Sequence, residues 1–329
     1  MILALETSCD DTCAAVLRGD GTIASNVISS QGIHDRYGGV VPEVASRHHV
    51  ELVNAVVDDA LRQAGTALDG IDLVAVTQGP GLVGALLVGV ATAKAIAAPR
   101  GLPLAPVDHL QGHVAANFIG PDPFEPPFVC LLASGGHTLL ARVTEHDGFE
   151  VLGRTLDDAS GEAFDKGARL LGLPYPGGPA LERLAADGDP EAFAFPTAKQ
   201  VAGLDFSFSG LKTALLYAVR DLGEEETARR AADLAASYQS AIVRALIARC
   251  ERALEQTGMD RLALGGGVAA NGPLRAAAEG LGVALHVPDR ALCTDNAAMI
   301  ASAARFVEAV PHPAYLAMDA YASGERALA

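Results

Sequence analysis

Two distant stretches of the chain share one plan, and that plan limits the folds the chain can form. Residues 2–17 and 128–143 each read as an apolar strand, a short turn rich in Ser, Asp or Gly, and a second apolar strand. Further strand-like runs at 73–77 and 262–264 alternate with long Ala- and Leu-rich stretches of helical character. The pattern predicts an α/β protein that contains a duplicated hairpin.

The length of the chain, 329 residues, is too great for one small core and suits two domains. A Pro-rich connector at 120–128 cannot continue a helix, so we place the boundary there. We expect domains at 1–120 and 121–296, with an irregular insertion at about 175–210 in the second. A C-terminal helix at about 297–329 could pack back on the first domain.

Charge and cysteine usage narrow the possible partners and compartments. A net charge of −16 argues against a broad basic surface, so a nucleic-acid partner would need a local patch or a helper protein. The five cysteines are scattered without a CxxC pair, which argues against a disulfide framework. Because the chain starts without a basic leader and every long apolar window is broken by Gly, Pro or a charge, we expect a cytoplasmic protein without a membrane anchor.

Three glycine-rich turns are candidate ligand sites. Gly79, Gly81 and Gly84 spell G-x-G-x-x-G, but the further βαβ units of a dinucleotide-binding fold are absent, so close packing of Gly84 and Gly89 is favoured. The turn 134–136 is either an anion site or a plain Gly-Gly hairpin turn. In "GGGVAAN" a glycine turn enters a helix, which favours an anion or nucleotide site over simple packing.

The stretch "VDHLQGHVA" has helical character and places His109 and His113 four residues apart, on one face, where both rings can reach one metal ion. The residues between them, Leu110, Gln111 and Gly112, include no carboxylate, which argues against the H-E-x-x-H chemistry of metallopeptidases. The best third ligand is Asp295, which precedes a predicted helix, although the ordinary role of Asp at that place is an N-cap. Acidic and basic side chains at another helix start are most simply capping and surface charge: Glu162, Asp165 and Lys166.

Ten motifs together carry a specific resemblance that spans nearly the whole chain. They are "ETSCDDT", "YGGVVPEVASRHH", "GPGLVGALLVG", "HLQGH", "SGGHT", "GEAFDK", "YPGGP", "DFSFSGLKT", "GGGVAAN" and "CTDNAAMI". The sequence resembles the tRNA threonylcarbamoyladenosine transferase family, once described as O-sialoglycoprotein endopeptidases. The resemblance implies the fold of actin, Hsp70 and sugar kinases, with two RNase H-like lobes and a cleft between them.

The resemblance also implies site residues. His109, His113 and Asp295 correspond to the ligands of one divalent metal between the lobes, with Fe²⁺ favoured and Zn²⁺ as the alternative. Asp10 and Asp11 are candidate catalytic acids, and Asp11 departs from the Glu that many bacterial members have there. The implied substrate-binding residues are Leu132, Ala133, Ser134, Gly135, Gly136, Asp165, Gly178 and Asn271.

The implied reaction moves a threonylcarbamoyl group from threonylcarbamoyl-AMP to the exocyclic amine of adenosine at tRNA position 37, in tRNAs that read codons beginning with A. The implied partners are tRNA, a paralogue of the same fold and an ATPase helper protein. Two alternatives stay open at this point. One is a non-catalytic scaffold paralogue, and the other is an ATP-dependent carbamoyltransferase or kinase of the same superfamily.

Overall fold

The computed structural model describes residues 1–197 and 201–322, and their contacts divide the chain into two compact units. The first unit comprises Met1–Glu125, His146–Gly148 and Thr294–Ala329, and the second comprises Pro126–Glu145 and Phe149–Cys293. The chain therefore enters the second unit at Pro126, returns briefly to the first at His146–Gly148, and returns to it again at Thr294.

The first unit is built on a five-stranded sheet with the order β3-β2-β1-β4-β5. Its strands are β1 (Ile2–Glu6), β2 (Asp11–Leu17), β3 (Ile23–Ser30), β4 (Leu73–Gly79) and β5 (Leu104–Asp108). β1 pairs antiparallel with β2 and parallel with β4, so the sheet is mixed. The parallel arrangement brings the carboxyl ends of β1, β4 and β5 to one edge of this sheet.

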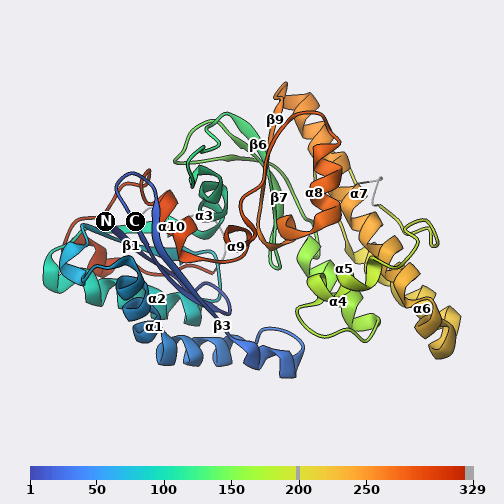
Figure 1. Ribbon diagram of the computed structural model, residues 1–329, viewed down its shortest axis with the longest axis horizontal. Helices are drawn as coiled ribbons and strands as arrows, with labels where there is room; N and C mark the ends of the chain where they lie inside the picture. The colour runs from blue at the N-terminus through green and yellow to red at the C-terminus, as the bar shows by residue number, and fades with distance from the viewer. Residues whose placement is uncertain (198–200, 323–329) are drawn as a thin grey trace. The chain divides into compact units, whose positions relative to one another are not determined.

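Helices pack against this sheet in two groups (Figure 1). The helices of the first group are α1 (Pro42–Ala64) and α2 (Val83–Ala97), which pack on each other and on β2, β3 and β4. Those of the second group are α3 (His109–Ala115) and α10 (Ala297–Ala303), which pack on each other, and α10 also contacts β1 and β2.

The alternation of side chains along the strands decides which residues face each group. Leu3, Leu5 and Val76 lie in the core cluster that α1 and α2 complete. Because neighbouring side chains on a strand point to opposite faces, Glu6 and Thr77 lie on the other face, toward α3 and α10. The alternation of side chains along β1 and β4 thus places Glu6 and Thr77 next to α3, the helix that carries the two histidines.

The G-x-G-x-x-G segment serves close packing in the first unit. A Cβ on Gly81 would lie 2.6 Å from the carbonyl oxygen of Ser8, and one on Gly89 would collide with the hydroxyl of Thr7. Gly89 therefore lets α2 approach the end of β1, as predicted, whereas Gly84 lies beside Ser46 of α1.

One described segment, Val83–Arg100, is long and apolar enough to cross a membrane by length and composition alone. It contains α2, which packs against β4 and α1, and core helices of soluble proteins pass the same test. The segment Val83–Arg100 is therefore only weak support for a membrane span.

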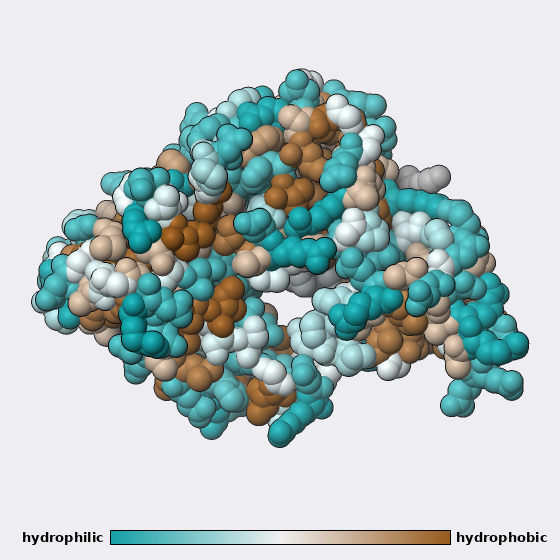
Figure 2. Space-filling view, in the orientation of Figure 1, coloured by the Kyte–Doolittle hydropathy of each residue, from teal (hydrophilic) through white to brown (hydrophobic). Residues whose placement is uncertain are grey.

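Hydrophilic residues predominate on the face shown in Figure 2, with smaller hydrophobic patches among them.

The second unit repeats the sheet of the first. Its order is β10-β9-β6-β7-β8, with strands β6 (Phe128–Ala133), β7 (Thr138–Val143), β8 (Glu150–Arg154), β9 (Arg261–Gly265) and β10 (Ala284–His286). The hairpin of β6 and β7 holds the place of the hairpin of β1 and β2, and β9 runs parallel to β6 as β4 does to β1. The predicted duplication of the hairpin is confirmed.

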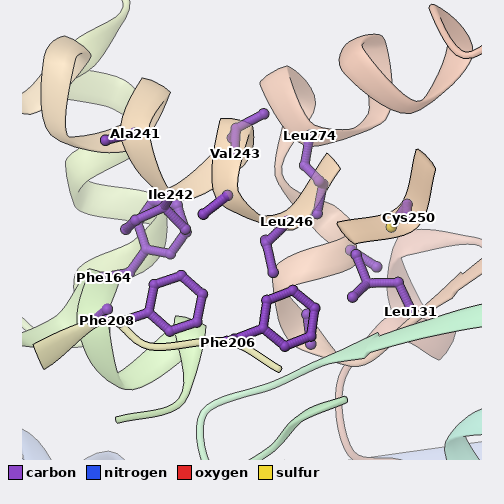
Figure 3. Packing of buried hydrophobic residues seen from close by; sticks show 14 of the residues in the cluster. Leu131, Phe164, Phe206, Phe208, Ala241, Ile242, Val243, Leu246, Cys250 and Leu274 are labelled. Atoms are coloured by element: carbon purple, nitrogen blue, oxygen red, sulfur yellow. The ribbon is translucent and has the colours of Figure 1, made fainter. Parts of the chain in front are cut away.

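Among its described residues, the second unit has six α-helices. They are α4 (Ser160–Leu170), α5 (Gly177–Ala185), α6 (Ser209–Arg229), α7 (Ala231–Thr257), α8 (Gly272–Glu279) and α9 (Arg290–Cys293). Figure 3 shows Phe206 and Phe208 packed with Ile242 and Leu246 of α7 in the core of this unit. The segment predicted as an irregular insertion, 175–210, contains α5, while residues 198–200 lie outside the described residues.

The C-terminal helix is shorter than predicted. α10 ends at Ala303, and the chain continues through turns to a short 3₁₀-helix at Ala314–Ala317. Pro311 and Pro313 explain why no long helix follows, since proline lacks the amide hydrogen and clashes with the preceding turn. The remainder of the predicted helix, 323–329, lies outside the described residues.

Candidate functional site

The helix α3 carries both histidines directly after β5. Asp108 caps it, because its carboxylate accepts the amide hydrogens of Leu110 (2.8 Å) and Gln111 (3.1 Å). The His109 and His113 rings meet edge to face with their centroids 4.7 Å apart. Both side chains are almost fully buried, at 6% and 1% exposure. The structure therefore places His109 and His113 on one helix with their rings adjacent, as their four-residue spacing predicts.

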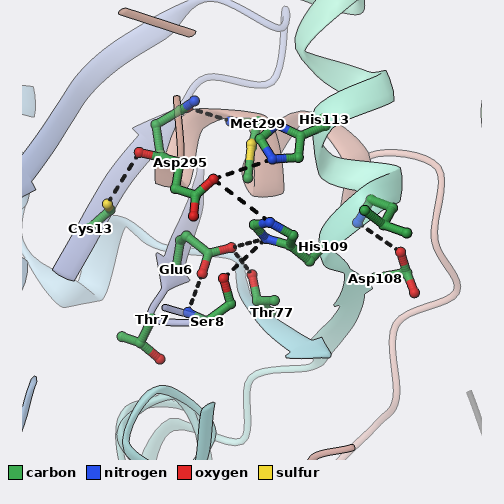
Figure 4. Close-up of polar contacts among 12 residues, drawn as sticks. Glu6, Thr7, Ser8, Cys13, Thr77, Asp108, His109, His113, Asp295 and Met299 are labelled. Atoms are coloured by element: carbon green, nitrogen blue, oxygen red, sulfur yellow. Dashed lines mark hydrogen bonds and ion pairs between the residues drawn. The ribbon is translucent and has the colours of Figure 1, made fainter. Parts of the chain in front are cut away.

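Asp295 approaches the histidines from the segment before α10. The N-cap of α10 is Asn296, whose side-chain oxygen accepts the amide hydrogen of Met299 at 2.9 Å. The alternative role of Asp295 as an N-cap is thus wrong. Its Oδ1 lies 3.3 Å from Nε2 of His113 and 3.7 Å from Nε2 of His109 (Figure 4).

The three side chains have the geometry of a metal site. One ligand atom from each lies within 4.8 Å of the others, a spacing that a small shift converts to ligand bonds of about 2.0–2.2 Å. Neither ring nitrogen of His113 has a hydrogen-bond partner among the described residues, although both are buried. A metal would satisfy one of these nitrogens. Two imidazoles and one carboxylate suit either Zn²⁺ or Fe²⁺.

Sequence reasoning missed Glu6, which contacts His109 from the end of β1. Its Oε2 lies 3.0 Å from Nδ1 of His109 and accepts the hydroxyl hydrogen of Thr77 at 2.6 Å. Burial alone raises the pKa of Glu6, but the charge and hydrogen bond of His109 lower it below its usual value. Burial alone lowers the pKa of His109, and the carboxylates of Asp295 and Glu6 raise it to about 9. A metal at Nε2 must therefore displace a proton.

Asp10 and Asp11 follow β1 in the same unit. Asp11 begins β2 opposite Ser30, whereas Asp10 lies in the preceding turn. Burial, above all, raises the pKa of Asp11 to about 7, with further contributions from the charges of Asp295, Asp10 and Glu6, against a hydrogen bond from Ser30. The side chain of Asp11 is therefore close enough to the candidate metal ligand Asp295 for the charge of Asp295 to affect its pKa.

Buried His49 of α1 holds the turn that carries these acids. Its Nε2–H donates to the carbonyl of Cys9 at 3.0 Å, and its Nδ1 accepts the hydroxyl hydrogen of Thr12 at 2.8 Å. Burial lowers the pKa of His49, in keeping with a neutral ring. Two anchors on one ring fix residues on both sides of Asp10 and Asp11.

The predicted substrate-binding residues lie in the second unit. Leu132 and Ala133 end β6, and Ser134 closes a tight turn by donating its amide hydrogen to the carbonyl of His137 at 2.8 Å. Gly135 and Gly136 are exposed and neither has a positive φ. Apart from the adjacent residues of the chain, no described atom lies within 4 Å of the place of a Cβ on either glycine. The turn itself therefore does not require glycine at these two positions.

Asp165 and Gly178 are brought together at the start of α5. The carboxylate of Asp165 accepts the amide hydrogens of Gly177, at 2.8 Å, and of Gly178. Burial raises the pKa of Asp165 despite these hydrogen bonds. Lys166 instead pairs with Asp158 at 2.7 Å and with Glu162 at 2.8 Å.

Asn271 is the N-cap of α8 and almost fully buried. Its side-chain oxygen accepts the amide hydrogen of Leu274 at 3.0 Å, and its Nδ2 donates to Gln239 at 2.9 Å. Its helix position agrees with the prediction, and Nδ2 carries a second hydrogen beyond the one Gln239 accepts.

Comparisons with solved structures concern the fold of the chain, which contains two mixed five-stranded sheets with their helices. The activator of 2-hydroxyisocaproyl-CoA dehydratase from Clostridium difficile, with bound ADPNP, is similar in structure, with a TM-score of 0.55, 15% identity and coverage of 92% of this chain and 93% of that one. HypF of T. kodakarensis has a TM-score of 0.59 at 16% identity and covers 92% of this chain and 47% of its own. These likenesses show the fold.

The sequence profile described as tRNA N6-adenosine threonylcarbamoyltransferase matches residues 22–302, and the chain belongs to this family. A relative of that name from Symbiobacterium thermophilum is 53% identical over 93% of this chain and 91% of its own. Others from Anaeromyxobacter dehalogenans (strain 2CP-1) and Clostridium perfringens (strain SM101) are 55% and 49% identical, over 92% and 93% of this chain and 92% of their own.

Proposed function

We propose that this chain transfers a threonylcarbamoyl group to the N6 amine of adenosine in tRNA. The observation that carries the proposal is the family match, which extends over 22–302 and is accompanied by relatives of that name at about half identity over most of both chains. The donor is threonylcarbamoyl-AMP and the acceptor is the adenosine beside the anticodon in tRNAs that read codons beginning with A.

We assign one divalent metal to His109, His113 and Asp295, with Fe²⁺ favoured by the family resemblance and Zn²⁺ as the alternative. The unpaired, buried nitrogens of His113 support the assignment. When bound, the metal would supply Lewis-acid polarisation of a carbonyl and would orient the donor. His109, His113 and Asp295 hold their ligand atoms on one side of the sheet of the first unit, anchored through α3 and α10.

In the transfer step, N6 of adenosine forms a bond to the carbamoyl carbon. The bond between that carbon and the phosphate oxygen breaks, AMP leaves, and N6 loses a proton. We assign the proton to Asp10 or Asp11. A pKa of about 7 for Asp11 in the metal-free protein supports a general base, because a base works best when its pKa is near the operating pH.

We assign the residues of the second unit to the donor. Gly135 and Gly136 leave room for a ligand to approach the main chain, and main-chain amides in such a turn suit a phosphate. Gly178 at the start of α5 and Asn271 at the start of α8 complete this group, with Asp165 of α4, whose carboxylate contacts the start of α5. The three remaining residues come directly before Gly135 and Gly136: Leu132 and Ala133 end β6, and Ser134 closes the turn.

We further propose a cytoplasmic location and two protein partners, a paralogue of the same fold and an ATPase helper. Exposed apolar side chains on α1 and α2 support a protein partner, since Val50 is 61% exposed and Leu87 43%. These residues line a groove with Val53, Asn54, Val88, Ala91 and Thr92.

The test is incubation of the purified protein, with partners supplied, with threonylcarbamoyl-AMP and unmodified tRNA, followed by mass analysis of the nucleosides. The proposal expects the mass of one threonylcarbamoyl group on adenosine, and none when His109→Ala is used. A protein that supports modification only by another subunit would be a scaffold. A product that forms only with ATP and carbamoyl phosphate would instead identify the alternative enzyme class.

A further inference from the structure

Glu6 is a buried carboxylate at the end of β1, and three hydrogen-bond donors surround it. Its side chain is 1% exposed. Oε2 accepts the hydroxyl hydrogen of Thr77 at 2.6 Å and lies 3.0 Å from Nδ1 of His109, while Oε1 accepts the amide hydrogen of Ser8 (Figure 4). A buried carboxylate is costly unless each oxygen is satisfied, and here three groups converge on it.

These contacts decide which nitrogen of His109 carries hydrogen. An ionised carboxylate can only accept hydrogen bonds, so the nitrogen that faces Glu6 must be Nδ1–H. Oγ of Ser8 lies 3.2 Å from the same nitrogen and can then act as a second acceptor. In a neutral ring the other nitrogen, Nε2, then carries the lone pair. Nε2 is also the nitrogen that faces Oδ1 of Asp295, at 3.7 Å. The carboxylate therefore selects the tautomer in which the lone pair of His109 points toward the other two candidate ligands.

The second histidine has no such support. Nδ1 of His113 has no hydrogen-bond partner among the described residues. The ring of His113 is held by packing, whereas that of His109 is held by a charge-assisted hydrogen bond to Glu6. The two histidines are thus unequal, and Glu6 acts on only one of them.

We propose that Glu6 is a positioning residue that holds His109 in its Nδ1–H form and makes Nε2 a stronger metal ligand. The proposal rests on the metal site assigned above to His109, His113 and Asp295. A carboxylate behind a ligating histidine fixes the ring and increases its basicity, and loss of such a partner commonly costs ten- to a hundredfold in metal affinity.

The first experiment measures the Zn²⁺ dissociation constant of the full chain by competition with a chelator. Glu6→Gln keeps the shape of the side chain but removes the charge, and we expect Zn²⁺ to bind about ten- to a hundredfold more weakly. Glu51→Gln is the matched control, because Glu51 belongs to the same unit and its side chain is 71% exposed. His109→Ala serves as the reference for loss of the site.

A second measurement separates positioning from a merely structural role. In the Zn²⁺-loaded protein labelled with ¹⁵N-histidine, the Nδ1 proton of His109 should give a downfield resonance that exchanges slowly with water. Glu6→Gln should move this resonance and speed its exchange while leaving the signals of His113 in place. Thr77→Val, which removes one donor to Glu6 but keeps the carboxylate, should have a smaller effect of the same kind.

The outcomes distinguish this proposal from the metal site itself. If Glu6→Gln binds Zn²⁺ like the unmodified chain while His109→Ala does not, the metal site stands and the role of Glu6 is overturned. If His109→Ala also binds normally, the metal site is wrong and the proposal falls with it. If Glu6→Gln does not fold, the ¹⁵N-histidine spectrum of the unmodified, Zn²⁺-loaded protein still tests the proposal. The absence of a proton on Nδ1 of His109 in that spectrum would overturn it.

Discussion

Nε2 of His113 lies 3.3 Å from Oδ1 of Asp295, yet neither nitrogen of this buried ring has a hydrogen-bond partner among the described residues. A fold would gain nothing from such a ring, because a buried polar atom without a partner costs about 1–3 kcal/mol. A metal ion bound to Nε2 would satisfy one of these nitrogens, and this relationship leads to the first prediction.

In metal-free protein, His113→Leu should be at least as stable as the unmodified chain, because leucine has a similar volume and removes the unpaired nitrogens. Added Zn²⁺ or Fe²⁺ should stabilise the unmodified chain but not the variant, since only a state that binds the ion gains free energy. Thermal unfolding with and without metal, together with elemental analysis, checks both parts. Strong destabilisation of the metal-free variant, or a full metal content, would contradict the site.

Asp11 should make the stability of the metal-free protein fall as the pH rises. Its folded-state pKa is about 7, above the ordinary 3.8, chiefly because of burial. The folded state therefore holds a proton that the unfolded state has lost between about pH 4 and pH 7, and stability declines across this window. The difference between these two pKa values corresponds to at most about 4 kcal/mol of unfolding free energy.

The variant Asp11→Asn should remove this decline. It should match the unmodified chain below about pH 4 and exceed it above pH 7, as measured by denaturant unfolding in chelator. Asp69→Asn is the control, because the side chain of Asp69 is 96% exposed. A difference between Asp11→Asn and the unmodified chain that stays constant with pH would show that Asp11 keeps its ordinary pKa.

Binding of tRNA by the isolated chain should be weak and should fall steeply with salt. The net charge of −16 opposes a polyanion, so any affinity must come from a local group of cations. Fluorescence anisotropy with labelled tRNA at several salt concentrations measures both quantities, and a partner complex should bind more tightly. A low dissociation constant that does not change with salt concentration would contradict this prediction and indicate a binding surface that does not depend on cations.

The sequence predicted the centre of each sheet better than its edges. The apolar runs at 2–17 and 128–143 form the hairpins β1–β2 and β6–β7, because buried strands leave a strong apolar signal. The edge strand β3 was missed, since Ile23–Ser30 alternates weakly and includes polar residues. β5 was missed because Pro106 argues against a strand by local rules, yet it lies at the edge of its sheet.

Local spacing could predict only part of the candidate metal centre. His109 and His113 share a helix face, so their four-residue spacing was enough to place them together. Local reasoning named Asp295 as the best third ligand but left it between that role and capping, a role that Asn296 takes. No local pattern could reveal Glu6, whose partners Thr77 and His109 come from other elements and meet it only when β1, β4 and α3 assemble.

The two adjacent acids Asp10 and Asp11 should contribute unequally to transfer. β2 begins at Asp11, while Asp10 lies in the turn and uses its carbonyl to accept the amide hydrogen of Gln31 at 3.1 Å. The charges of Asp295 and Glu6 act on Asp11, so we expect Asp11 to be the acid near the metal ligands. If Asp11 is that acid, a misplaced carboxylate could cost around a hundredfold in rate.

We therefore expect Asp11→Ala to lose most of the single-turnover rate of transfer to tRNA while keeping its metal, and Asp10→Ala to lose much less. Asp11→Glu introduces the residue that many members of the resembled family have at this position. It should increase the transfer rate little, because the turn held by His49 suits the shorter side chain. Each protein is compared at verified metal content and equal folding. Near-normal rates in both alanine variants would remove the carboxylates from the mechanism and leave the metal ligands and the main-chain amides as the groups that act on the donor.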